Sequence, residues 1–232
     1  MSKLRGILMA AVASLVLVAG ASQVNAAEGE ALPPAHDWSF NGLFGTFDRA
    51  ALQRGYKVYK DVCASCHAMK YVAFRNLVDI GFTEGEAKAL AEEYEVAGDP
   101  DAFGDPTTRK AALSDIFPAP YQNEQAGRAA NGGALPPDLS LITKAREHGP
   151  DYIRALMVGY EDAPADMTMG PGMNYNVYFP GHQVAMPAPL SEGIVEYADG
   201  TEASVEQMAE DVTTFLHWAA NPELERWHEI GF

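Results

Sequence analysis

Residues 55–68 read Gly-Tyr-Lys-Val-Tyr-Lys-Asp-Val-Cys-Ala-Ser-Cys-His-Ala, and this stretch decides the fold. The chain has two cysteines, Cys63 and Cys66, and both lie here, directly before His67. Two thiols at this spacing can bond the two vinyl groups of one haem while the adjacent imidazole ligates its iron. The stretch therefore predicts a c-type haem site.

Two other interpretations of the cysteine pair compete with haem. A thioredoxin-like redox pair requires a βαβ context, which the neighbouring sequence lacks. Half of a zinc site requires further Cys or His ligands at short spacing, and none follows. The pattern favours haem over both.

Helix signals surround the motif. Asp48 is suited to cap a helix that runs straight into Cys63, with Leu52, Tyr56 and Tyr59 on its inner face. A second helix is indicated by the capping box of Thr83 and Glu86, with residues 98–100 as its stop.

Two more helices are predicted in the second half of the chain. One begins near Pro150, a residue favoured at the first helical position, and ends before Gly159. The last has Ser204 and Gln207 at its start, carries one apolar stripe, and ends before Pro222.

Irregular segments separate these helices. Residues 28–47 read as an arm lying over the core, while 98–126 and 160–190 read as long loop insertions. Residues 194–197 followed by Asp199-Gly200 suggest a small β-hairpin. The predicted fold is mostly α, a c-type cytochrome fold with long loop insertions and a small β-hairpin.

The first residues resemble a secretory leader. Lys3 and Arg5 supply positive charge, residues 7–19 are apolar, and residues 24–26 resemble a cleavage site. We therefore expect a signal peptide over 1–26 and one cytochrome c domain over 27–232. No later stretch reaches the length of about 20 apolar residues that a membrane span needs.

The formal net charge is −16, so nucleic acid is not expected as a partner. Such acidity suits a basic partner, although solubility alone would also explain it.

A haem iron ligated by His67 has a sixth position, whose occupant decides between electron transfer and chemistry on a small ligand. Four methionines of the loop-rich segment are candidates: Met167, Met169, Met173 and Met186. Prolines flank Met186 and would stiffen its loop. His182 is a rival, although an exposed loop histidine is its simpler interpretation.

Beyond the haem motif, the chain closely resembles cytochrome c1, the haem subunit of the cytochrome bc1 complex of the respiratory chain. The resemblance covers nearly all of the expected mature chain in order. It is carried by Gly55 to Ala68, Thr83 to Glu93 (TEGEAKALAEE), Ala129 to Leu141 (AANGGALPPDLSL), Tyr178 to Pro189 (YFPGHQVAMPAP) and Asp211 to Pro222 (DVTTFLHWAANP).

The resemblance implies one covalently attached haem c, bonded at Cys63 and Cys66 and ligated by His67 and Met186. It implies that Arg146 pairs with a haem propionate. The family positions that line the haem pocket are matched by Asn131, Pro136, Pro137, Tyr152, Leu156, Phe179, Val184 and Pro189.

The resemblance also implies partners and location. The family receives electrons from the Rieske iron–sulfur protein, works beside cytochrome b, and passes electrons to a cytochrome c, with no independent catalysis. The exposed acids Glu92, Glu93 and Glu95 are candidates to steer a basic acceptor. Relatives carry a C-terminal membrane anchor beyond the segment that ends here at Phe232. We therefore expect the periplasmic side of the bacterial inner membrane.

Two other functions compete with this one. A free-standing periplasmic electron carrier would need no anchor, but the two long insertions suit docking in a complex. An enzyme that binds peroxide at an open iron would lack the sixth ligand, and a di-haem peroxidase would need a second haem motif.

Overall fold

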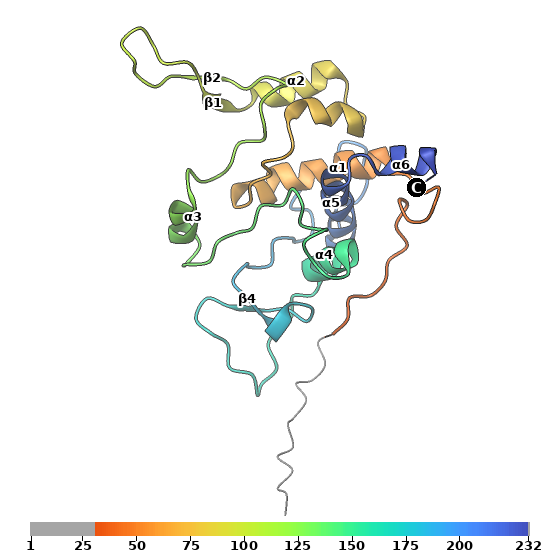
Figure 1. The fold of residues 1–232 in the computed structure, drawn as a ribbon. Coiled ribbons are helices and arrows are strands. Elements are labelled where there is room, and N and C mark those ends of the chain that lie inside the picture. Colours follow the sequence, from red (N-terminus) through yellow and green to blue (C-terminus); the bar gives the residue numbers. More distant parts are fainter. Residues whose placement is uncertain (1–30, 232) are drawn as a thin grey trace, which may run out of the picture.

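Helices α1 and α5 cross at the centre of the computed structural model, which describes residues 31–231 (Figure 1). α4 packs against α5. The predicted mostly α fold with long irregular segments is confirmed. The elements are α1 (Arg49–Asp61), η1 (Cys63–Ser65), η2 (Phe74–Ile80), α2 (Glu84–Glu92), β1 (Glu95–Ala97), β2 (Thr108–Lys110), α3 (Glu124–Ala130), α4 (Gly149–Val158), β3 (Asn174–Tyr175), η3 (Pro180–His182), β4 (Gln183–Val184), α5 (Val205–Ala220) and α6 (Leu224–Ile230), where η marks a 3-10 turn.

Three predicted helix starts are confirmed by their caps. The Asp48 carboxylate accepts from the amides of the first turn of α1. Thr83 and Glu86 form the expected capping box of α2, and Ser204 accepts from the amide of Gln207. These caps satisfy amides that have no partner inside the helix.

The α1–α5 crossing depends on a glycine. A Cβ atom at Gly55 would lie 2.0 Å from the carbonyl oxygen of Asp211 and 2.7 Å from Cβ of Phe215. The two backbones approach this closely only because α1 has no side chain at that point. Tyr56 and Tyr59 flank the crossing and pack against Phe215.

A buried ion pair ties the same two helices. The Arg54 guanidinium donates from Nε to one carboxylate oxygen of Asp211 and from a terminal nitrogen to the other, both at 2.9 Å. Asp211 is fully buried, and Arg54 also pairs with Asp199 at 3.0 Å. Removing one partner of such a pair costs about 3–5 kcal/mol because a buried charge remains.

The arm predicted over residues 28–47 is confirmed for its described part, from residue 31 onward. Trp38, Phe40 and Phe47 are buried although their segment is irregular. The Phe40 ring stacks on His217 of α5, with the ring centroids 4.4 Å apart. The arm therefore covers α5 with aromatic side chains rather than with a helix or strand.

The predicted hairpin at residues 194–200 is wrong. Val195 and Tyr197 are both buried, so the alternation in the sequence is real, but they pack into the core without a partner strand. The hairpins of the described residues are β1–β2 and β3–β4. β1 begins at Glu95, so α2 ends before the predicted stop at residues 98–100, and the β1–β2 hairpin extends away from the helices (Figure 1).

Two short helices, α3 and α6, lie in segments that the sequence did not mark as helical. α6 is held by Glu225, which pairs with Arg49 at 2.6 Å, and by His228 Nδ1, 2.7 Å from the carbonyl oxygen of Gly45. Within residues 31–231, no helix has the length and apolar character required to cross a membrane.

We predict that Gly55→Ala lowers the free energy of unfolding by about 3 kcal/mol, because the new methyl group overlaps backbone atoms of α5. Urea unfolding measures this change. Gly85→Ala in α2 is the matched control: a Cβ there meets nothing within 4 Å, so it should stabilise by roughly 0.5–1 kcal/mol through helix propensity. Equal effects of the two substitutions would contradict the close crossing.

Because His217 is a partly buried histidine, we predict that the folded protein loses stability in acid. Its burial lowers its pKa from 6.5 to about 4. Between these values the unfolded chain binds a proton that the folded chain does not, so stability present above pH 6.5 falls as the pH drops toward 4. The loss is roughly 2–3 kcal/mol. Urea unfolding of His217→Gln across this range should show a flatter curve than wild type, and parallel curves would contradict the prediction.

Candidate haem-binding site

The Cys-x-x-Cys-His motif forms a tight turn at the end of α1. Val62 ends the helix, η1 follows, and the amides of Cys66 and His67 both donate to the carbonyl of Cys63, at 3.1 and 2.9 Å. The two thiols and the imidazole lie within five consecutive residues. The turn brings all three to the same end of α1.

The two cysteines are free and half-buried, and they form no disulfide with each other. Burial, and to a lesser extent the neighbouring Cys66, raises the pKa of the Cys63 thiol to about 12. Cys63 is therefore an uncharged thiol in the folded chain.

The His67 ring is oriented by a backbone carbonyl. Its Nδ1 lies 2.8 Å from the carbonyl oxygen of Pro137, which can only accept, so Nδ1 carries the proton and Nε2 keeps its lone pair. Burial lowers the pKa of His67, against the opposing effects of Pro137 and Asp138, and this favours the neutral ring. A neutral imidazole whose other nitrogen is anchored has the form in which histidine ligates metals.

The segment that supplies this carbonyl is bonded to the chain just after the motif. The amide of Leu139 donates to Ala68 at 2.9 Å, and the amide of Lys70 donates to Asp138 at 3.0 Å. The backbone amide of Tyr71 donates to the hydroxyl of Ser140 at 3.1 Å. Pro137, predicted as a pocket wall, is therefore also the hydrogen-bond partner of His67.

A second segment, residues 159–186, is organised around Asn176. Asn176 is fully buried, and its amide nitrogen donates to the carbonyl of Leu156 at 2.9 Å. Its side-chain oxygen accepts from the backbone amide of Tyr178 at 3.0 Å, and its own backbone amide donates to the carbonyl of His182. These bonds attach the loop that carries Met186 to the end of α4.

The interpretation of His182 as an exposed loop residue is wrong. The side chain is half-buried, its Nδ1 lies 3.2 Å from the carbonyl oxygen of Asn176, and its ring stacks on Tyr175 at 5.6 Å. Its φ of 58° places it in the left-handed region beside Gly181. The ring is thus engaged in holding the β3–β4 turn.

Several other predicted pocket residues gather along α4 and this loop. Tyr152 and Val184 are buried, while Leu156, Phe179, Met186 and Pro189 are half-buried. The bonds from Asn176 to Leu156 and from Val177 to Gly159 join the two segments. Apolar side chains of this kind suit a dry wall.

Asn131 and Arg146 have other partners. The Asn131 amide donates to the Tyr121 hydroxyl at 3.0 Å and to the carbonyl of Gly127 at 2.7 Å, at the end of α3. Arg146 is exposed, and its guanidinium donates to the carbonyl of Ala145. Pro136 is half-buried. The roles of Asn131 and Arg146 at a haem stay predictions.

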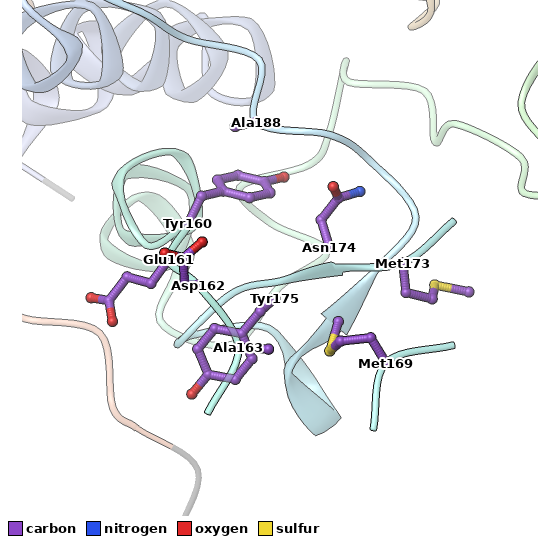
Figure 2. A pocket seen from close by; sticks show the side chains of 9 residues that line it. All are labelled: Tyr160, Glu161, Asp162, Ala163, Met169, Met173, Asn174, Tyr175 and Ala188. Carbon is purple, nitrogen blue, oxygen red and sulfur yellow. The ribbon is translucent and has the colours of Figure 1, made fainter. Parts of the chain in front are cut away.

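An open pocket of about 520 Å³ lies beside the Met186 loop rather than beside Cys63 (Figure 2). Tyr160 and Asn174 are among the side chains that line it. Neither residue was expected at the site, because nothing in the local sequence separates them from other loop residues.

The donor groups fit a covalently bound haem. Two free thiols stand with two residues between them in the Cys-x-x-Cys-His motif, the neutral imidazole has an available Nε2, and a methionine lies in a loop bonded to the fold. A mostly helical domain with this motif at the end of its first helix has the arrangement of a c-type cytochrome.

The family model described as "Cytochrome C1 family" matches residues 38–232, and the chain belongs to this family. "Cytochrome c1, heme protein, mitochondrial" of Kluyveromyces lactis is 51% identical over 212 residues, which are 91% of this chain and 73% of that protein. "Cytochrome b-c1 complex catalytic subunit, mitochondrial" of Candida albicans is 53% identical over 204 residues, 88% and 71% of the two chains. "Cytochrome b/c1" of Bradyrhizobium diazoefficiens is 47% identical over 252 residues, covering 97% of this chain and 37% of that protein.

We predict that Asn176→Ala lowers the free energy of unfolding by roughly 2–4 kcal/mol, because buried groups of Leu156 and Tyr178 lose their partners. Hydrogen exchange should also speed up at the amides of Tyr178 and His182. Asn123→Ala, which removes an exposed cap of α3, should cost only about 1 kcal/mol and leave those amides unchanged. Unchanged exchange in Asn176→Ala would contradict its central position in the loop.

Proposed function

We propose that this chain carries one haem c through thioether bonds at Cys63 and Cys66, with His67 and Met186 as axial ligands. The observation that supports this most strongly is the His67 ring, fixed by the carbonyl of Pro137 at the end of the helix that presents two free thiols. When bound, the haem supplies an iron that gains and loses one electron.

The protein residues would orient and tune that iron. Pro137 holds the proton of His67 on Nδ1, which leaves Nε2 for ligation. As a ligand, the thioether of Met186 would favour the reduced iron and so raise the reduction potential. Arg146, if it pairs with a propionate, would neutralise a carboxylate near the iron. We assign the surrounding wall to Asn131, Pro136, Pro137, Tyr152, Leu156, Phe179, Val184 and Pro189.

The proposed task is electron transfer within a ubiquinol–cytochrome c reductase. In this assignment the chain works beside cytochrome b, takes electrons from the Rieske iron–sulfur protein, and passes them to a cytochrome c. Family membership and the b-c1 wording in the names of relatives support a place in such a complex. The chain itself would make and break no substrate bonds.

The acidic surface supports a basic electron acceptor. Glu92, Glu93 and Glu95 are exposed where α2 ends and β1 begins. Lys88 and Lys60 pair with two of them, at 3.8 Å to Glu92 and 2.5 Å to Glu93, which weakens their field. With a chain charge of −16, steering would therefore be spread over the surface rather than supplied by these three residues alone.

We also propose export of the domain over 27–232 to the periplasmic side of the inner membrane, with a C-terminal anchor holding it there. The leader predicted over 1–26 lies outside the described residues. The charge pattern of the sequence and the resemblance to the family support this location.

We predict that Met186→Leu abolishes the near-infrared band of sulfur-to-iron charge transfer in the oxidised protein and lowers the reduction potential, because leucine cannot ligate iron. Optical spectra and a redox titration of the haem-loaded protein measure both. The haem should stay covalently attached, since the thioether bonds at Cys63 and Cys66 are untouched.

Met169→Leu and Met173→Leu are matched controls from the same loop-rich segment and should keep the band. His182→Ala tests the rival ligand and should keep it too. A wild-type protein without the band, or a band that survives in Met186→Leu, would exclude Met186 as the ligand.

A further inference from the structure

The backbone carbonyl of Met186 accepts hydrogen bonds from two side chains. The Tyr160 hydroxyl lies 3.1 Å from this oxygen, and Nδ2 of Asn174 lies 3.4 Å from it. Asn174 also lies 3.4 Å from the carbonyl of Val184. Two donors from separate segments therefore converge on the main chain of one residue.

Both donors are themselves firmly placed. Tyr160 follows α4 by two residues and pairs with Asn176 in an isolated β-bridge, while the amide of Val177 donates to the carbonyl of Gly159 at 2.9 Å. Asn174 lies in β3, opposite Val184. The hydrogen bonds of Tyr160 thus connect the Met186 loop to the end of α4, which packs on α5.

Packing alone is weak on this side of the loop. Tyr160 and Asn174 line the open pocket, and Ala188, two residues after Met186, lies on its border (Figure 2). Pro187 and Ala188 are exposed. Because few atoms cover the loop here, its position depends on the hydrogen bonds to the Met186 carbonyl more than on apolar contacts.

We propose that Tyr160 and Asn174 are positioning residues for Met186, which hold the loop so that its thioether stays on the iron. This inference rests on the proposed role of Met186 as a ligand. Opening of the loop breaks both hydrogen bonds, so they lower the population of the open form. The loss of one such bond raises that population by roughly five- to ten-fold.

The test uses the haem-loaded full chain and imidazole as a competing ligand. Imidazole occupies the sixth position only when Met186 leaves, so its apparent affinity reports the open population. Tyr160→Phe, which removes one hydroxyl, should bind imidazole to oxidised haem roughly five- to ten-fold more tightly than wild type. Its near-infrared band should also fade at a lower temperature. Asn174→Ala should shift both readouts in the same direction but less, because its bond is longer.

Tyr175→Phe is the matched control. It removes a tyrosine hydroxyl from the same pocket, but no hydrogen bond of the described residues links that hydroxyl to Met186. Imidazole affinity and the band should equal those of wild type.

The outcomes separate the possible failures. Wild-type imidazole affinity and an unchanged band in both Tyr160→Phe and Asn174→Ala would overturn the positioning role, even if the variants unfold at a lower temperature. If Tyr160→Phe does not mature, Asn174→Ala decides the question alone. A wild-type protein that lacks the band overturns the ligand assignment and this inference together. This result distinguishes a failure of the proposed function from a failure of the positioning role alone.

Discussion

The close crossing of α1 and α5 is the constraint on which the rest of the structure depends. Gly55 lets the two backbones touch, and the buried pair of Arg54 and Asp211 holds them in one register. α1 ends in the turn that carries Cys63, and α5 supports α4. The crossing therefore relates the motif at the end of α1 to the loop that α4 holds, although Met186 of that loop comes more than a hundred residues after the motif in the sequence.

Local signals in the sequence predicted local structure well. Asp48, Thr83 and Ser204 start helices because each cap needs only residues within the next turn. The haem motif was found for the same reason, since its three donor residues lie within five positions. α3 and α6 escaped prediction because each is short, and α6 is also held by a distant residue, since Glu225 pairs with Arg49.

The parts that could not be predicted depend on distant pairings. The alternation around Val195 and Tyr197 indicates buried side chains, but a strand also needs a neighbour, and none lies there in the described fold. Pro137 was expected as a wall residue, but nothing in the sequence marks it as the partner of His67, because the bond is made to its backbone carbonyl and every residue type has one. Tyr160 meets the Met186 carbonyl across 26 positions, and no local pattern encodes such a contact.

The distance between Arg54 and Asp211 along the chain has a consequence for biosynthesis. They are 157 positions apart, so α1 is synthesised well before α5. Non-local contacts of this kind form late, because the intervening chain must first be present and then ordered. The turn that holds Cys63 and Cys66 is complete long before then, so attachment of a cofactor to the thiols can precede folding. The thiols would in that case be modified in an open, accessible segment rather than in a finished domain.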